Sequence, residues 1–278
     1  MTEAVVEQAQ QKASNSSFYS AMRLMPKAER EAMFAIYGFC RIVDDIADDG
    51  IGTRPERAAQ LTQWRADLDA LYAGHPPARA QFLVEHVRRY GLRKADFLTV
   101  IDGMDMDVVE DVIAPDLATL DLYCERVASA VGRLSIKVFG MDEEPGDELA
   151  HHLGRALQLT NILRDIDEDA AIHRLYLPRE YLDAAGITTR DPKAVIADPR
   201  IDRVCKRVAV DAHKFYDGAA AVLAKKPRGR IGTPRLMGAV YQEILRQTEA
   251  VGWAPPRTRV SLSKPKLLAI VLRHGLFG

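Results

Sequence analysis

Two short acidic segments contain the residues whose types and spacing best suit chemistry. In the first, Asp44 and Asp48 are separated by one helical turn and therefore lie on the same face of a helix. That face continues towards the N-terminus through Arg41, Tyr37 and Met33, so the carboxylates extend a stripe that begins apolar and inward-facing. The spacing predicts two carboxylates that point from a helix into the protein.

The second acidic segment repeats this arrangement with an amide in place of one acid. Asn161, Asp165 and Asp169 share one helical stripe, and Gln158 precedes them on it. Gly154 lies further back on the stripe, where a small residue leaves room for something else. Two such helices facing each other would place carboxylate and amide oxygens on both sides of a shared space.

Clustered carboxylates need a physical explanation, because unpaired buried charge costs several kcal/mol and like charges add to that cost. A solvated helix end is the simplest interpretation of the first segment taken alone, although acids near a helix C-terminus also oppose the helix dipole. Oxygen-only ligands favour a hard cation such as Mg²⁺, which completes its coordination with water and phosphate oxygens. The two segments together therefore predict a clamp for a diphosphate group.

At these residues the chain resembles the squalene/phytoene synthase family, whose members join two prenyl diphosphates head to head. The resemblance covers almost the whole length and rests on residues 17–19, 35–48, 123–132, 153–169 and 174–178. Within the family, residues 16–19 and 131–140 are similar to the bacterial enzymes of hopanoid biosynthesis that make presqualene diphosphate. The resemblance to the family implies an all-α isoprenoid-synthase (terpenoid synthase) bundle around a central cavity.

The resemblance also assigns roles to individual residues. Mg²⁺, with several ions in one site, would be held by Asp44, Asp48, Asn161, Asp165 and Asp169. The catalytic residues would be Asp44, Asp48, Asp165, Asp169, Tyr37 and Tyr123. The substrate would be bound by Asn15, Ser17, Phe18, Arg41, Gln158, Arg164, Arg174, Tyr176, Tyr241 and Arg259. The resemblance also implies that Asn15 and Ser17 belong to an N-terminal flap that closes over the substrate. Ser16 stands where several relatives have a basic residue, which puts phosphate contacts from this flap in question.

The implied reaction condenses two farnesyl diphosphates to presqualene diphosphate and diphosphate. Phytoene or dehydrosqualene synthesis on the same fold stays open, as does a full squalene synthase that uses NADPH. We do not expect NADPH, because Gly50-Ile51-Gly52 lacks the third glycine of a dinucleotide-binding loop and no strand precedes it. A non-enzymatic assembly factor is a further alternative, but Asp or Asn at all five ligand positions favours retained metal chemistry.

Helical patterns dominate the chain, and Pro/Gly-rich breaks separate them. We expect one all-α domain over residues 1–278, with residues 1–14 flexible and residues 257–278 as a C-terminal tail. Residues 103–107 are acidic and lie near a predicted helix end. A solvated helix end is the favoured interpretation, and a position near the site is the alternative. The helices are predicted over residues 26–50, 55–73, 78–90, 94–107, 117–139, 147–171, 199–224 and 234–251.

Composition excludes several classes of protein. A net charge of -1 provides no basic field for nucleic acid. Three widely spaced cysteines exclude a disulfide scaffold, and the chain has neither a signal-peptide pattern nor a long apolar run. We therefore expect a cytoplasmic protein. Residues 264–277 mix cationic and apolar side chains and could lie on the inner membrane surface, where downstream hopanoid-pathway enzymes would be partners, or dock on the protein.

Overall fold

The structure is a computed structural model that describes residues 22, 25–48, 52–109 and 111–275. These residues form helices joined by loops, with one isolated bridge between Ile113 and Leu175. The prediction of an all-α fold is therefore confirmed. The elements are α3 (Lys27–Asp48), α4 (Arg54–Tyr72), η1 (Ala78–Leu83), α5 (Val84–Tyr90), α6 (Lys94–Val109), α7 (Leu117–Cys124), η2 (Glu125–Ser129), α8 (Ala130–Val138), α9 (Glu143–Arg164), α10 (Ile166–Ala171), α11 (Arg179–Ala184), α12 (Pro192–Ala197), α13 (Ile201–Ala224), α14 (Gly232–Val251) and α15 (Lys264–Gly275).

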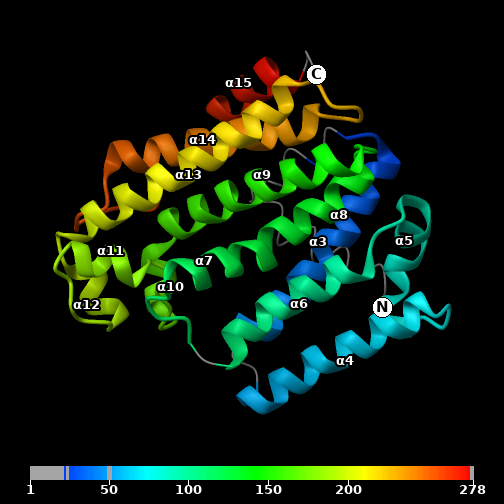
Figure 1. The fold of residues 1–278 in the computed structure, drawn as a ribbon, viewed down its shortest axis with the longest axis horizontal. Helices are drawn as coiled ribbons and strands as arrows, with labels where there is room; N and C mark the ends of the chain where they lie inside the picture. Colours follow the sequence, from blue (N-terminus) through cyan, green and yellow to red (C-terminus); the bar gives the residue numbers. More distant parts are fainter. Residues whose placement is uncertain (1–21, 23–24, 49–51, 110, 276–278) are drawn as a thin grey trace.

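α9 runs through the middle of the bundle, with α13 and α14 on one side and α8 on the other (Figure 1). Small residues on α9 and on α8 permit the close contact of α9 with η2 and α8. A Cβ atom at Gly154 would lie 2.7 Å from the backbone of Ser129, and one at Gly132 would lie 2.9 Å from Ala150. The room left by the small residues of α9 is therefore filled in part by the backbone of the neighbouring helices.

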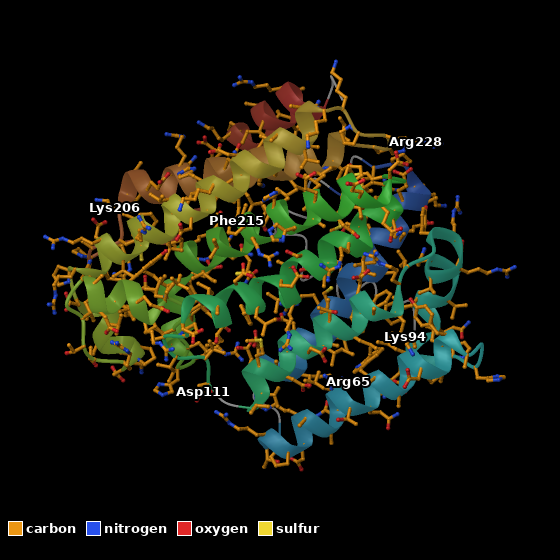
Figure 2. All side chains as sticks on the ribbon, viewed as in Figure 1. Arg65, Lys94, Asp111, Lys206, Phe215 and Arg228 are labelled. Atoms are coloured by element: carbon orange, nitrogen blue, oxygen red, sulfur yellow. The ribbon has the colours of Figure 1, made fainter. Side chains whose placement is uncertain are left out.

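α3 is held by aromatic side chains on its buried face. Phe39 is fully buried and packs edge-on against Phe97 of α6 and Trp64 of α4, with ring centroids 4.9 and 5.7 Å apart. Arg65 of α4, which Figure 2 labels, also joins α4 to α6 through an ion pair with Asp102, 2.7 Å long. This packing leaves the opposite face of α3, with its first acidic segment, directed at the interior of the bundle.

The predicted helix over residues 117–139 is interrupted by the π turn η2. The turn coincides with a buried guanidinium, because Arg155 of α9 is only 4% exposed and donates to Asp121, Glu125 and Ser129. These three acceptors come from successive turns of the chain and converge on one side of it. A π turn is common where a helix accommodates such a constraint, and periodicity alone does not reveal it.

The prediction of one helix from residue 147 to residue 171 is wrong at its C-terminal end. α9 stops at Arg164, since Asp165 has φ −108° and ψ 18°, and α10 continues after it. The indole Nε1 of Trp253 donates to the carbonyl of Leu163 across a distance of 2.8 Å. A side chain distant in sequence therefore satisfies a carbonyl group beside the break.

Two helices, α11 and α12, were not predicted, because each has only six residues and too few turns to show a period. Residues 264–275 form α15, which packs on α14 through Leu267, Ile270 and Val271. Leu268 and Leu272 remain 58% and 50% exposed on its outer side. In the part of the chain that the structure describes, no helix combines the length and the apolar character needed to cross a membrane.

Candidate active site

A cavity of about 430 Å³ lies between α3, α6, η2, α8, α9 and α14. It brings together residues that the sequence analysis selected from the helices of both acidic segments, α3 and α9, and from two other helices, α7 and α14. The predicted site residues that line it are Tyr37, Arg41, Asp44, Tyr123, Gln158, Asn161, Arg164 and Tyr241. Asp44 and Asn161, one from each acidic segment, therefore face a common hollow. The other predicted ligands and substrate-binding residues that the structure describes are not part of its lining: Asp48, Asp165, Asp169, Arg174, Tyr176 and Arg259.

The cavity has an apolar part and a polar part. Along α9 its lining begins with Leu149 and Leu153, continues through Leu157, and ends with Asn161 and Arg164. At 1.5 Å per residue, the Cα atoms of Leu149 and Arg164 are roughly 22 Å apart along the helix axis. The remaining apolar lining includes Val100, Met104, Val131, Ile136, Phe139 and Met237. Such a cavity suits a molecule with a long hydrocarbon chain and an anionic head.

Arg41 neutralises the first acidic segment. Its guanidinium pairs with Asp44 at 2.6 Å and with Asp45 on the next position of the helix. Burial and, after it, the charge of the neighbouring Asp48 raise the pKa of Asp44 to about 7, while Arg41 opposes the shift. The carboxylate is thus held in an environment that has too little positive charge for it.

Two arginines neutralise the second acidic segment. Arg164 donates to Asp165 at 2.7 Å, and Arg259 from the C-terminal segment reaches the same carboxylate at 2.8 Å. The structure thus brings Arg259 to the acidic segment instead of leaving it in a solvent-facing tail. Burial and the charge of Asp165 raise the pKa of Asp169 to about 8.

Arg174 connects the two acidic segments. Its guanidinium pairs with Asp48 and donates to the carbonyl of Ala47, and its backbone N–H donates to the carbonyl of Asp169 at 2.8 Å. The chain reaches this position through the bridge beside Leu175, whose N–H donates to the carbonyl of Val112. Asp48 and Asp169 are thereby held near each other.

The donor set at this end of the cavity fits a hard cation. Asn161 Oδ1 is a buried acceptor without a hydrogen-bond partner, and burial together with a neighbouring carboxylate raises the pKa of both Asp44 and Asp169. Among the described residues, however, no three acidic, histidine or cysteine side chains converge as a ready-made metal site. Arginine side chains pair with the carboxylates instead, so a cation would have to displace them.

Asp107 is a site residue that the sequence analysis did not select. A solvated helix end was the favoured interpretation for it, and this is wrong, because Asp107 is 3% exposed. Its carboxylate accepts hydrogen bonds from Tyr123 and Tyr176. A signal was present, since Asp107 continues the buried stripe of Val100 and Met104 on α6.

Three of the predicted substrate-binding residues lie outside the described part of the chain. They are Asn15, Ser17 and Phe18. Their proposed role as a flap over the substrate therefore stays a prediction.

A second hollow, of about 420 Å³, lies on the outer side of α9. Apolar side chains such as Leu120 and Phe215 line it, and Figure 2 labels Phe215 on α13. Its charged groups pair with each other, for example Lys214 with Asp211 at 2.8 Å. The central cavity is the better candidate site because its lining includes Asp44, whose pKa is raised, and the unpartnered Oδ1 of Asn161.

A family model described as squalene/phytoene synthase matches residues 11–266. The chain belongs to this family. A presqualene diphosphate synthase from Zymomonas mobilis is 56% identical over 94% of the chain and 89% of its own length. A protein of the same name from Rhodopseudomonas palustris is 53% identical over 95% of the chain and 94% of its own length. A 15-cis-phytoene synthase from a Paracoccus species is more distant, at 33% identity over 97% of the chain and 88% of its own length.

Solved structures agree with the family assignment. Squalene synthase HpnC from Alicyclobacillus acidocaldarius superimposes with a TM-score of 0.78. It is 26% identical, and the match covers 91% of this chain and 96% of that one. The predicted isoprenoid-synthase fold around a central cavity is therefore confirmed.

Proposed function

We propose that this family member condenses two farnesyl diphosphates head to head, giving presqualene diphosphate and inorganic diphosphate. The observation that carries the proposal is 56% identity, over 94% of the chain, to a protein named presqualene diphosphate synthase. The cavity is consistent with it, because an apolar lining leads to an end that carries both arginines and carboxylates. It would serve as a prenyltransferase of hopanoid and squalene biosynthesis.

The proposed metal ligands are Asp44, Asp48, Asn161, Asp165 and Asp169. Bound Mg²⁺ would supply positive charge that stabilises the diphosphate as it leaves the allylic carbon. The unpartnered Oδ1 of Asn161 and the raised pKa values of Asp44 and Asp169 support this assignment. Arg41, Arg164, Arg174 and Arg259 would bind diphosphate oxygens.

The chain's own residues would then control an allylic cation. Departure of the first diphosphate leaves a farnesyl cation, and the C2–C3 double bond of the second farnesyl group attacks its C1. Loss of a proton closes the cyclopropane ring. Tyr37, Tyr123 and Tyr241 line the cavity near its polar end, where aromatic faces and hydroxyl dipoles stabilise positive charge. The apolar lining keeps water from quenching the cation to farnesol.

We also propose that α15 rests on an anionic membrane surface. Its outer side exposes Leu268 and Leu272, and residues 264–275 include Lys264, Lys266 and Arg273 but no acid. An apolar stripe with cationic neighbours is the pattern of a helix that lies in a lipid interface. This placement would suit a product with a C30 hydrocarbon body, and it agrees with a peripheral position on the cytoplasmic side.

Incubation of the purified chain with radiolabelled farnesyl diphosphate and Mg²⁺ tests the proposed reaction. We expect presqualene diphosphate, both with and without NADPH. Parallel incubation with geranylgeranyl diphosphate tests phytoene synthesis. Squalene formed only with NADPH, or preferential turnover of the C20 substrate, would contradict the proposed product.

A further inference from the structure

Asp107 is the centre of a buried hydrogen-bond cluster beside the cavity. Tyr176 Oη donates to its Oδ1 at 2.9 Å, and Tyr123 Oη lies 3.2 Å from its Oδ2. The two tyrosine rings stack with their centroids 4.8 Å apart, and their hydroxyl oxygens are separated by 3.2 Å. One carboxylate therefore receives two phenolic hydroxyls from two different segments of the chain.

The packing of α6 against the chain around η2 creates this cluster. Gly103 is the point of closest approach, since a Cβ atom there would lie 2.7 Å from Val127. Asp107 lies one turn after Gly103, and Tyr123 lies one turn before Val127. The Gly103–Val127 contact and the Asp107–Tyr123 contact are therefore one turn apart where α6 packs against the chain around η2. A short aspartate side chain spans the distance because the helices are this close.

Only Tyr123 of this cluster lines the cavity. Asp107 is 3% exposed and Tyr176 is 5% exposed, and neither belongs to the cavity wall. The carboxylate could therefore influence a bound prenyl chain only through the Tyr123 hydroxyl.

The chemistry of the acceptor determines the direction of that hydroxyl. An ionised carboxylate accepts hydrogen bonds and cannot donate. Burial raises the pKa of Asp107, while Arg174, 3.8 Å from Oδ1, and the hydrogen bonds from Tyr176 and Tyr123 oppose this shift. Both hydroxyls and the guanidinium are donors, so the carboxylate is the acceptor in each of these contacts. The Tyr123 hydrogen therefore points at the Asp107–Tyr176 side, which leaves an oxygen lone pair for the cavity.

We propose that Asp107 is a positioning residue, which holds the Tyr123 hydroxyl with its oxygen lone pair towards the cationic prenyl intermediate. This inference rests on the proposed function and deepens it. A fixed dipole with its negative end at the developing positive charge stabilises the transition state without having to reorganise. Asp107 itself touches neither substrate nor metal.

The substitution Asp107→Asn tests this role without changing the size of the side chain. The amide oxygen keeps the place of Oδ1, because Tyr176 and Arg174 both present N–H or O–H groups there. The amide Nδ2 then faces Tyr123 and donates to its oxygen. The lone pair is occupied, and the hydroxyl hydrogen turns away from residue 107.

We expect kcat with farnesyl diphosphate to fall roughly 10- to 100-fold in Asp107→Asn, with KM nearly unchanged. Tyr123→Phe should lower kcat to a similar extent. The double variant should be no slower than Tyr123→Phe alone, because both changes act on the same hydroxyl. Binding of a non-ionisable farnesyl thiolodiphosphate with Mg²⁺, measured by calorimetry, should be unchanged in Asp107→Asn.

Asp96→Asn is the matched control. Asp96 is also a buried acid of α6, 4% exposed, and it pairs with Arg93 and Arg133 away from the cavity. Its loss should lower the melting temperature but leave kcat within about twofold of the wild type. The same fall in kcat in both variants would assign a structural role to Asp107 and overturn the inference.

Two further results would also overturn it. Multiplicative losses in the double variant would show that Asp107 acts independently of Tyr123. Weaker binding of the thiolodiphosphate would show that Asp107 acts through Arg174 on the diphosphate site. A wild-type chain that converts no allylic diphosphate would instead refute the proposed function itself, so the two failures are distinguishable.

Discussion

Replacement of Gly154 by alanine tests the close contact between α9 and the π turn. The new methyl group would lie 2.7 Å from Ser129 Cα and N, which are backbone atoms that cannot rotate aside. Separating packed helices to admit a methyl group costs about 1–3 kcal/mol, whereas removal of a helical glycine contributes about 0.5–1 kcal/mol. From the middle of each range, the net loss in the free energy of unfolding is roughly 1 kcal/mol, which corresponds to about 2–4 °C in melting temperature.

Gly238→Ala is the matched control on α14. The nearest atom to a Cβ there is Leu153 Cδ1 at 3.5 Å, which is an ordinary contact with the end of a flexible side chain. Only the helix-propensity gain then operates, so the melting temperature should stay the same or rise by roughly 1–4 °C.

Differential scanning calorimetry of the two variants measures these shifts, and turnover of farnesyl diphosphate measures their effect on the site. We expect Gly154→Ala to lose activity as well, because Gln158 and Asn161 lie one and two turns further along the same helix. Equal stability of Gly154→Ala and the wild type, or shifts of the same sign in both variants, would refute this account of the packing.

The remaining predictions concern the metal site, the membrane and a cysteine. Asp48→Ala and Asp165→Ala should each lower turnover by orders of magnitude while circular dichroism stays native; near-normal turnover in both would exclude the proposed clamp. A chelator should abolish product formation and added Mg²⁺ should restore it, whereas activity that persists would speak against the metal. Leu268→Ser/Leu272→Ser should reduce co-sedimentation with vesicles of anionic lipid, while Val210→Ser, at an exposed position of α13, should not; equal binding by both would refute the lipid contact. Burial raises the pKa of Cys124 to about 12, so this thiol should stay unreactive to a thiol reagent at pH 8 until guanidinium is added; rapid reaction of Cys124 in the native state would contradict its burial.

Local pattern predicted much of this molecule, because helical periodicity and spacing depend only on neighbouring residues. The stripe that contains Asp44 and Asp48 and the stripe that contains Asn161 were recognised in this way, and Asp44 and Asn161 line the cavity. The break at Asp165 escaped prediction, since the residue that satisfies the Leu163 carbonyl is the distant Trp253.

Contacts between segments that are far apart in sequence account for the other omissions. From the sequence alone, Asp107 was interpreted as part of an exposed helix end. In the structure it is buried because Tyr123 and Tyr176, from two other parts of the chain, donate hydrogen bonds to it. The resemblance to the family supplied Arg174 and Arg259 as residues for the diphosphate. It did not indicate that each pairs with a carboxylate of the acidic segments.

These ion pairs have a thermodynamic consequence. Inorganic diphosphate alone would have to take Arg174 away from Asp48 and would leave that acid uncompensated. A divalent ion alone would take Asp165 away from both arginines, which leaves Arg164 without this acid and Arg259 with Glu168 alone. Each ligand therefore relieves the penalty that the other incurs, and the two should bind with positive cooperativity. By linkage, each should raise the affinity of the chain for the other by the same factor.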